Sequence, residues 1–275
     1  MILTFLGSGS AFTYGDGNYQ SNMLLTDSNG QHLLIDCGSD ARFSLGEQGL
    51  GAGDISAVYV SHCHADHIGG LEWLGFATYF HSLCSRPRLF IEAHMAELLW
   101  EGALRAGMAS LEDRRAGLDT FFNVTRLPPQ GRFSWDRARL ELVPVVHHYN
   151  GPDAQPAFGL MIHAGPGGQQ ALLTTDTQFR PETLAPYYDR ADIIFQDCET
   201  YPHPSGIHAH YRQLVALPTR WKAKMWLYHY HPGPLPDCRA DGFLGFVRKG
   251  QRFDLSRPAS AAPSERVSDI GQSMS

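Results

Sequence analysis

The 275-residue chain lacks the sequence features of a membrane or a secreted protein. No apolar run approaches the ~20 residues that a helix needs to cross a bilayer. The first residues, MILTFLGSGSAF, place no basic residue ahead of a short apolar run, so we expect no signal peptide. The five cysteines are odd in number and form no Cys-x-x-Cys pair, which is typical of reduced thiols. We therefore predict a cytoplasmic protein without disulfides.

Positive charge is also scarce. The chain has 22 Lys and Arg against 28 Asp and Glu, which gives a formal net charge of -6. That balance provides no general attraction to nucleic acid or to an anionic membrane. We expect neither a membrane partner nor extended binding of nucleic acid.

Short apolar runs bounded by turn residues predict many buried strands. We expect strands over residues 2–7, 21–26, 32–38, 57–62, 88–93, 140–148, 157–164, 170–176, 192–197 and 224–230. We expect helices over residues 69–84, 94–108, 181–188 and 211–217. Two sheet-forming halves with helices outside them predict an α/β fold, a four-layer helix–sheet–sheet–helix sandwich. The domain should cover residues 1–252, and residues 253–275, rich in Ser, Ala and Pro, should form a disordered tail.

The stretch VYVSHCHADHIGG places three histidines and an aspartate within six residues, directly after an apolar run. Alternate residues of an extended segment share a face, so His62 and His64 at the end of the strand can converge on one ion. The side chain of Cys63 should then point away and pack. Imidazole and carboxylate donors without thiolate suit Zn, Mn or Fe.

Asp66 and His67 follow in the turn and can point toward a neighbouring position. Four such residues cannot all bind one ion and leave it reactive, so two ions that share further ligands are the better interpretation. One strand-end histidine alone is more often a surface or capping residue. Here, however, further apolar runs end in candidate ligands: His147 or His148, Asp176, and His229 or His231.

This order, His-x-His-x-Asp-His followed by His, Asp and His, resembles the metallo-β-lactamase superfamily of αββα metal hydrolases, over nearly the whole chain to about Arg252. The resemblance implies two divalent ions, Zn2+ or alternatively Mn2+. By the family pattern the first ion would take His62, His64 and His147, and the second Asp66, His67 and His229, with Asp176 bridging both. His148 and His231 would then make supporting contacts.

FLGSGSAF and LLIDCG are similar to the ribonuclease Z-like and phosphodiesterase branch. Asp36 is expected to hydrogen-bond a ligand histidine, or else to be only a turn residue. Gly7 and Gly9 could expose backbone N–H groups to a phosphate, or form a plain tight turn.

In ribonuclease Z-like enzymes an acidic residue after a strand and a later histidine form a proton-donating pair. Asp197 matches the acidic position in place of the usual Glu, and His208 or His210 matches the histidine, with His208 preferred by spacing. The alternative is that these histidines only begin a helix. A phosphodiester leaving group benefits from such a general acid. Asp66 would orient the attacking water.

Transfer RNA 3′-processing enzymes of this branch carry a long basic arm between the ligands that match His147 and Asp176. Here that interval contains no Lys or Arg, so a small phosphodiester such as a cyclic nucleotide is the expected substrate. Aromatic residues near the site could stack on a base or simply pack: Phe12, Tyr14, Tyr149, Phe179 and Tyr201.

We therefore predict a dinuclear metal-dependent hydrolase, a phosphodiesterase for small or cyclic nucleotides. The alternatives are a transfer RNA 3′-processing-type endonuclease, or a lactone or thioester hydrolase using the same centre. A metal-holding module that binds a ligand without turnover is the non-enzyme alternative. A homodimer is left open.

Overall fold

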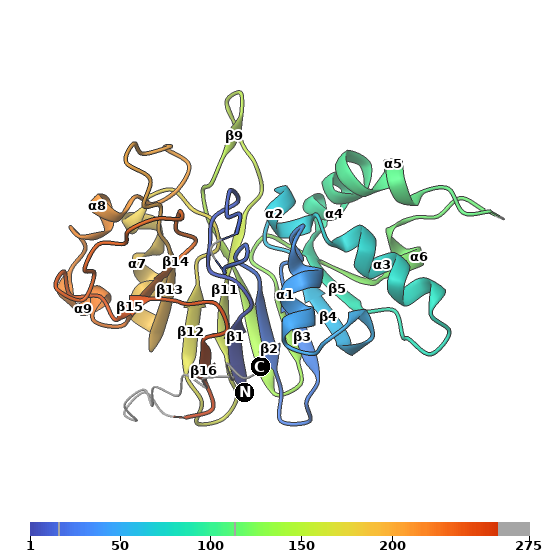
Figure 1. Ribbon diagram of the computed structural model, residues 1–275, viewed down its shortest axis with the longest axis horizontal. Coiled ribbons are helices and arrows are strands. Elements are labelled where there is room, and N and C mark those ends of the chain that lie inside the picture. Colours follow the sequence, from blue (N-terminus) through green and yellow to red (C-terminus); the bar gives the residue numbers. More distant parts are fainter. Residues whose placement is uncertain (16, 113, 258–275) are drawn as a thin grey trace, which may run out of the picture.

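Two large sheets face each other, and helices cover the outer face of each (Figure 1). The computed structural model describes residues 1–15, 17–112 and 114–257. The strand orders are β16-β1-β2-β3-β4-β5-β6 and β15-β14-β13-β12-β11-β8-β7. The predicted four-layer sandwich is confirmed.

The first sheet is antiparallel at one side and parallel at the other. Its strands β16, β1, β2 and β3 pair antiparallel, and β3 to β6 pair parallel. The bounds are β1 Ile2–Phe5, β2 Met23–Thr26, β3 His32–Ile35, β4 Ile55–Tyr59, β5 Arg88–Glu92, β6 Asn123–Leu127 and β16 Arg252–Asp254. Strand β4 ends at Tyr59, three residues before the predicted end at residue 62, so the histidine motif leaves the sheet through a short extended segment.

The second sheet has the same mixed character. Strands β12 to β15 pair parallel, while β7, β8, β11 and β12 pair antiparallel. The bounds are β7 Arg132–Trp135, β8 Ala138–Pro144, β11 Phe158–His163, β12 Gln170–Leu173, β13 Ile193–Asp197, β14 Met225–Tyr228 and β15 Gly245–Phe246. Between β8 and β11 a small hairpin, β9 Tyr149–Asn150 with β10 Asp153–Ala154, stands out from the end of the sandwich (Figure 1).

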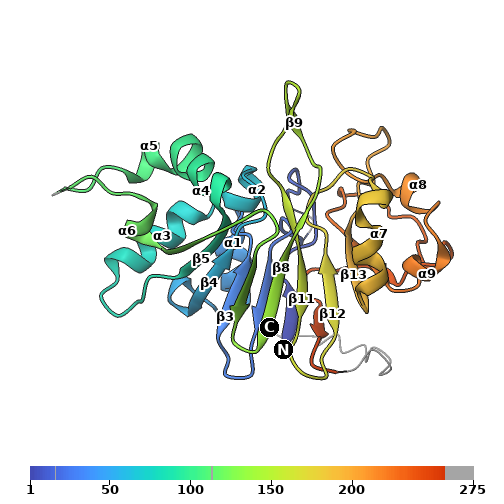
Figure 2. The same cartoon turned by 180° about the vertical axis from the view of Figure 1, so that it is seen from behind.

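The helices divide between the two outer faces (Figures 1 and 2). On the side of the first sheet lie α1 Ala41–Glu47, α2 Ala65–Ile68, α3 Leu71–Phe80, α4 Ala93–Leu99, α5 Arg105–Met108 and α6 Leu118–Phe121. On the other side lie α7 Pro181–Arg190, α8 Tyr211–Leu214 and α9 Thr219–Lys222. A 3-10 turn, Ala52–Asp54, precedes β4, and a π-helical segment, Trp100–Leu104, joins α4 to α5. The predicted helix over 94–108 is therefore continuous but changes its pitch.

The inner faces of the sheets share one apolar core. Phe5 of β1 packs against Phe195 of β13, with ring centroids 5.1 Å apart, and against Tyr228 of β14 at 5.4 Å. The buried hydroxyl of Tyr59 in β4 donates a hydrogen bond of 2.8 Å to the carbonyl oxygen of Phe158 in β11. These contacts fix the strand ends of the two sheets relative to each other, and those ends carry the predicted ligands.

The ordered fold runs past residue 252. Strand β16 pairs with β1 through Asp254, and Leu255 is buried. The predicted tail falls largely on residues 258–275, which lie outside the described residues. In the described part of the chain, no helix is long and apolar enough to span a bilayer.

Candidate metal centre

The histidine motif lies in the connection between β4 and α2. The backbone stays extended at His64, and α2 begins at Ala65. The Nε2 atom of His62 and the Nδ1 atom of His64 are 3.1 Å apart, so the two rings converge as the alternation predicted. Cys63 instead packs against the core.

One donor set contains His62, His64, His147 and Asp176, whose ligand atoms all lie within 4.8 Å of one another. His147 follows β8, and its Nε2 lies 3.1 Å from Nδ1 of His64. Asp176 follows β12, and its Oδ2 lies 3.7 Å from Nε2 of both His62 and His147. Three imidazole nitrogens and one carboxylate oxygen thus surround a single point, which is a typical zinc donor set.

A second donor set contains Asp66, His67, Asp176 and His229. Oδ2 of Asp176 lies 3.2 Å from Nε2 of His67 and 3.4 Å from Nε2 of His229. Oδ2 of Asp66 lies 3.1 Å and 3.4 Å from the same two nitrogens. Asp176 therefore belongs to both sets, in the position that the sequence pattern assigned to it.

The chemistry of this cluster fits a pair of cations. Oδ1 of Asp176 is buried and accepts no hydrogen bond from the described residues. A buried carboxylate oxygen normally has a partner, and a metal ion would provide one. Within the described chain, His148 and His231 belong to neither donor set. The ring of His148 lies 4.3 Å from that of His64, which is a supporting position.

Burial and neighbouring charges shift the pKa values of the histidines in opposite directions in the two donor sets. Burial lowers the pKa of His62 and His64, and it lowers the pKa of His147 to about 4, so these rings are neutral and ready to bind a metal. Burial would also lower the pKa of His67 and His229. There the neighbouring carboxylates outweigh burial, and Asp176 above all raises the pKa of His229 to about 10.

Asp36 forms a hydrogen bond with a histidine of the second donor set, as predicted. Its Oδ2 lies 2.7 Å from Nδ1 of His67, which leaves Nε2 of that ring directed at the second donor set. The same carboxylate accepts hydrogen bonds from the backbone N–H and the hydroxyl of Ser61, and Oγ of Ser61 lies 3.0 Å from Nδ1 of His62. Sequence reasoning missed Ser61, because a serine before a histidine carries no signal of its own.

The Asp197–His208 pair lies between the two donor sets. Nδ1 of His208 is 2.9 Å from Oδ2 of Asp197, and Oδ1 of Asp197 is 3.4 Å from Nδ1 of His229. The ring of His208 lies 4.8 Å from that of His229 and 4.9 Å from that of His147. Burial opposes protonation of His208, but Asp197 outweighs it and raises the pKa of His208.

The structure does not support a catalytic His210. Its Nδ1 accepts a hydrogen bond from the backbone N–H of Arg212 and caps α8. Its Nε2 donates to the carbonyl oxygen of Tyr201 at 2.9 Å. With both ring nitrogens engaged away from the donor sets, His210 is the capping residue of the helix that the alternative interpretation described.

The glycine loop near the N-terminus forms neither a phosphate site nor a plain tight turn, because hydrogen bonds to distant segments hold it. The N–H groups of Ser8, Gly9 and Ser10 donate to Oδ1 of Asn18, the carbonyl oxygen of Tyr19 and that of Tyr230. None of them is left for a ligand. A Cβ at Gly7 would lie 2.3 Å from the backbone of the Tyr19–Gln20 segment, so close chain approach explains the glycine there.

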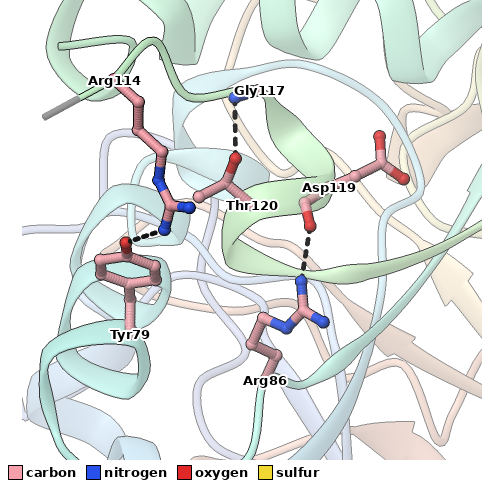
Figure 3. A pocket seen from close by; sticks show the side chains of 6 residues that line it. All are labelled: Tyr79, Arg86, Arg114, Gly117, Asp119 and Thr120. Carbon is pink, nitrogen blue, oxygen red and sulfur yellow. Dashed lines mark hydrogen bonds between the residues drawn. The ribbon is translucent and has the colours of Figure 1, made fainter. Parts of the chain in front are cut away.

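Two cavities differ in their relation to this centre. One, of about 480 Å³, lies beside α3 and α6, where Arg114 donates to the hydroxyl of Tyr79 and Arg86 to the carbonyl oxygen of Asp119 (Figure 3). No site residue lines it. The other, of about 610 Å³, is lined by Tyr230 and His231, which directly follow His229, and by residues of the facing β1–β2 loop.

A mixed αββα sandwich with paired histidine–aspartate sets at its strand ends defines a metallo-β-lactamase-fold protein. YhfI of Bacillus subtilis, a metallo-β-lactamase fold protein, superimposes with a TM-score of 0.71 at 17% identity, covering 92% of this chain and 99% of that one. A diphosphatase of the PhnP family gives a TM-score of 0.68 at 20% identity, covering 92% and 96%.

The sequence identifies the family within this fold. Residues 1–253 match the family described as Anti-Pycsar protein Apyc1, and the chain belongs to that family. The Anti-Pycsar protein Apyc1 of Paenibacillus harenae is 32% identical over 232 residues, which cover 84% of this chain and 90% of the relative.

Proposed function

We propose that this protein is a metal-dependent phosphodiesterase that opens cyclic nucleotides. The observation that carries the proposal is the pair of convergent donor sets that share Asp176, with Asp197 and His208 beside both. Membership of the family named Anti-Pycsar protein Apyc1 supports a cyclic nucleotide as the substrate. The diphosphatase of the same fold agrees with chemistry at phosphorus.

Two divalent ions fit the site as the sequence pattern assigned them. His62, His64 and His147 would hold one ion, Asp66, His67 and His229 the other, and Asp176 both. Bound there, two such ions neutralise charge on the phosphoryl oxygens and lower the pKa of the attacking water. Neutral imidazole and carboxylate donors favour Zn2+, with Mn2+ as the alternative.

The chain's own residues then complete the reaction. Asp66, whose Oδ2 lies beside the nitrogens of His67 and His229, would orient the attacking water. His208 keeps Nε2 free of hydrogen bonds to the described residues while Asp197 holds Nδ1, so Nε2 can protonate the ribose oxygen that leaves. Asp197 fixes the ring and, by its charge, outweighs burial and raises the pKa of His208, which favours the protonated form.

The surroundings favour a small substrate. The segment between His147 and Asp176 carries no Lys or Arg, and most of its exposed residues lie in the short β9–β10 hairpin. A clamp for a folded polyanion would need cations there. A single cyclic phosphate needs only the metal centre. A protein of this kind would act in the cytoplasm, on dissolved nucleotides.

Purified protein loaded with Zn2+ or Mn2+ should be assayed against 3′,5′-cyclic nucleotides, linear phosphodiesters, lactones and thioesters. We expect cyclic nucleotides to be opened fastest, with activity lost in chelator and restored by metal. Stoichiometric retention of cyclic nucleotide without turnover would identify a binding module instead. Faster turnover of a lactone or thioester would assign the centre to carbonyl chemistry.

A further inference from the structure

The structure separates the five aromatic residues that could stack on a base. Phe179 packs against the apolar core cluster beneath α7, so its ring is not available to stack on a base. Phe12 and Tyr14 are 80% and 92% exposed and have no ring partner among the described residues. Tyr149 lies on the protruding hairpin. Tyr201, 52% exposed, differs from these because its ring centroid lies 5.3 Å from that of His231 at an angle of 43°.

Hydrogen bonds hold the two chain segments that carry this ring pair. The carbonyl oxygen of Tyr201 accepts the 2.9 Å hydrogen bond from His210. The N–H of His231 donates to Oγ1 of Thr200, the residue before Tyr201, at 3.1 Å. Preorganised aromatic surfaces lose little conformational entropy when they bind a planar ligand. His210, which takes no part in the chemistry, thus acquires a role as the support of Tyr201.

The loop that carries Tyr201 also carries the general acid. It ends at His208, and the carbonyl oxygen of Ile207 lies 2.9 Å from Nδ1 of His147. In a cyclic nucleotide the leaving oxygen and the base belong to one ribose. A ribose whose leaving oxygen lies at His208 therefore has its base close to the same loop.

A cavity beside His231 has room for a nucleobase. His231 lines the cavity of about 610 Å³, together with Tyr230 and residues of the β1–β2 loop. Small-molecule pockets in proteins commonly measure roughly 300–1,000 Å³, so a nucleoside fits this volume.

We propose that Tyr201 and His231 form a base platform, on which the nucleobase of the cyclic nucleotide stacks. The proposal rests on the proposed function and adds the residues that bind the non-reacting part of the substrate. Every base has a π-face, so stacking contributes similarly for purines and pyrimidines.

The decisive variant is Tyr201→Ala, compared with Tyr201→Phe and Tyr14→Ala. Loss of one base–aromatic stack is expected to raise KM for each 3′,5′-cyclic nucleotide by about 5- to 100-fold, with kcat nearly unchanged. An abasic ribose 3′,5′-cyclic phosphate should be opened equally by Tyr201→Ala and the unmodified protein. Tyr201→Phe keeps the ring and should keep KM, and Tyr14→Ala is the matched loss of a more exposed tyrosine.

A binding measurement separates this proposal from the proposed function. In the zinc-loaded protein, Tyr201→Ala should weaken calorimetric binding of adenosine and uridine 5′-monophosphates but not of ribose 5-phosphate. Equal losses with the abasic compounds would make Tyr201 a loop support and overturn the platform. The same KM effect in Tyr14→Ala would move the base to the β1–β2 loop. If the unmodified protein does not open cyclic phosphates, the proposed function is wrong. The affinities for the nucleoside 5′-monophosphates, compared with that for ribose 5-phosphate, would still test the base platform.

Discussion

Asp176 is the residue on which both donor sets depend. Its Oδ2 lies within 3.7 Å of four histidine nitrogens, and the neighbouring residue Thr175 adopts the left-handed backbone conformation, φ 53°, immediately before it. A non-glycine residue held there costs on the order of 1–3 kcal/mol and persists where its surroundings enforce it.

We therefore expect Asp176→Ala to lose both ions and all turnover. Elemental analysis after gel filtration should find about two metal ions in the unmodified protein and far fewer in the variant. Asp153→Ala, which removes an exposed aspartate of the β9–β10 hairpin, is the matched control and should keep its metal. Activity that persists in Asp176→Ala, or in chelator, would contradict the metal mechanism.

His208 should act on the leaving group alone. General acid catalysis is worth ~10²–10⁴-fold, so His208→Ala should lower kcat for cyclic nucleotides by that amount. The loss should shrink for a nitrophenyl ester, because nitrophenolate needs little protonation. Metal content should not change. An equal loss with both substrates, or loss of metal, would instead make His208 a structural or ligand residue.

Asp197 should set the pH range of that acid. The carboxylate raises the pKa of His208, so the ring stays protonated, and active as an acid, to higher pH than an ordinary histidine. Activity on cyclic nucleotides should fall as pH rises through that pKa. Asp197→Asn removes the charge, so the alkaline limb of the kcat profile should move to lower pH. An unshifted limb would show that another group controls it.

At the scale of elements, the buried hydroxyl of Tyr59 in β4 links the first sheet to β11 of the second sheet just beneath the site. Tyr59→Phe removes the donor to the Phe158 carbonyl oxygen and leaves that buried oxygen without it, which should cost about 1–3 kcal/mol of unfolding free energy. Tyr19→Phe is the matched control, because the Tyr19 hydroxyl bonds Glu47 at the exposed surface. Urea unfolding measures both. If Tyr59→Phe and Tyr19→Phe lose the same unfolding free energy, the buried hydrogen bond between the sheets is no stronger than a hydrogen bond at the surface.

The elements that the sequence predicted are those with a strong local signal. Residues 57–59 of β4 and the whole of β14 are apolar and buried. Strands β6 and β7 were missed because they mix polar and apolar residues, with burial supplied by the neighbouring strands. The three-residue strand β16 exists only through its pairing with β1, so it carries no pattern of its own.

The site divides in the same way. The alternation of His62 and His64 is local and could be predicted from the strand period. The convergence of Asp176 and His229 on the same centre could be expected only from the order of the family's ligands. The choice between His208 and His210 as the proposed acid depended on where α8 begins, because His210 at the N-cap position uses one ring nitrogen to cap the helix. No single-residue signal distinguishes the two.

For the whole molecule, charge should decide the size of substrate. The chain is acidic overall, with a net charge of -6, and the segment that projects beside the metal centre has no cation. Binding a folded polyanion releases counterions only where lysines and arginines meet phosphates, and this projecting segment provides none. A cyclic mononucleotide carries one negative charge, which the metal centre itself can neutralise.

We therefore expect the metal-loaded protein to open cyclic nucleotides far faster than it cleaves precursor transfer RNA. Because few phosphates would be neutralised, kcat/KM for a cyclic nucleotide should vary little between 50 and 200 mM salt, whereas a protein with 6–10 phosphate contacts loses ~10³–10⁵ in affinity over that range. Parallel assays of both substrates across this salt series test the prediction. Efficient 3′ cleavage of precursor transfer RNA, with a steep salt dependence and weak activity on cyclic nucleotides, would show that cations elsewhere on the surface replace the missing arm.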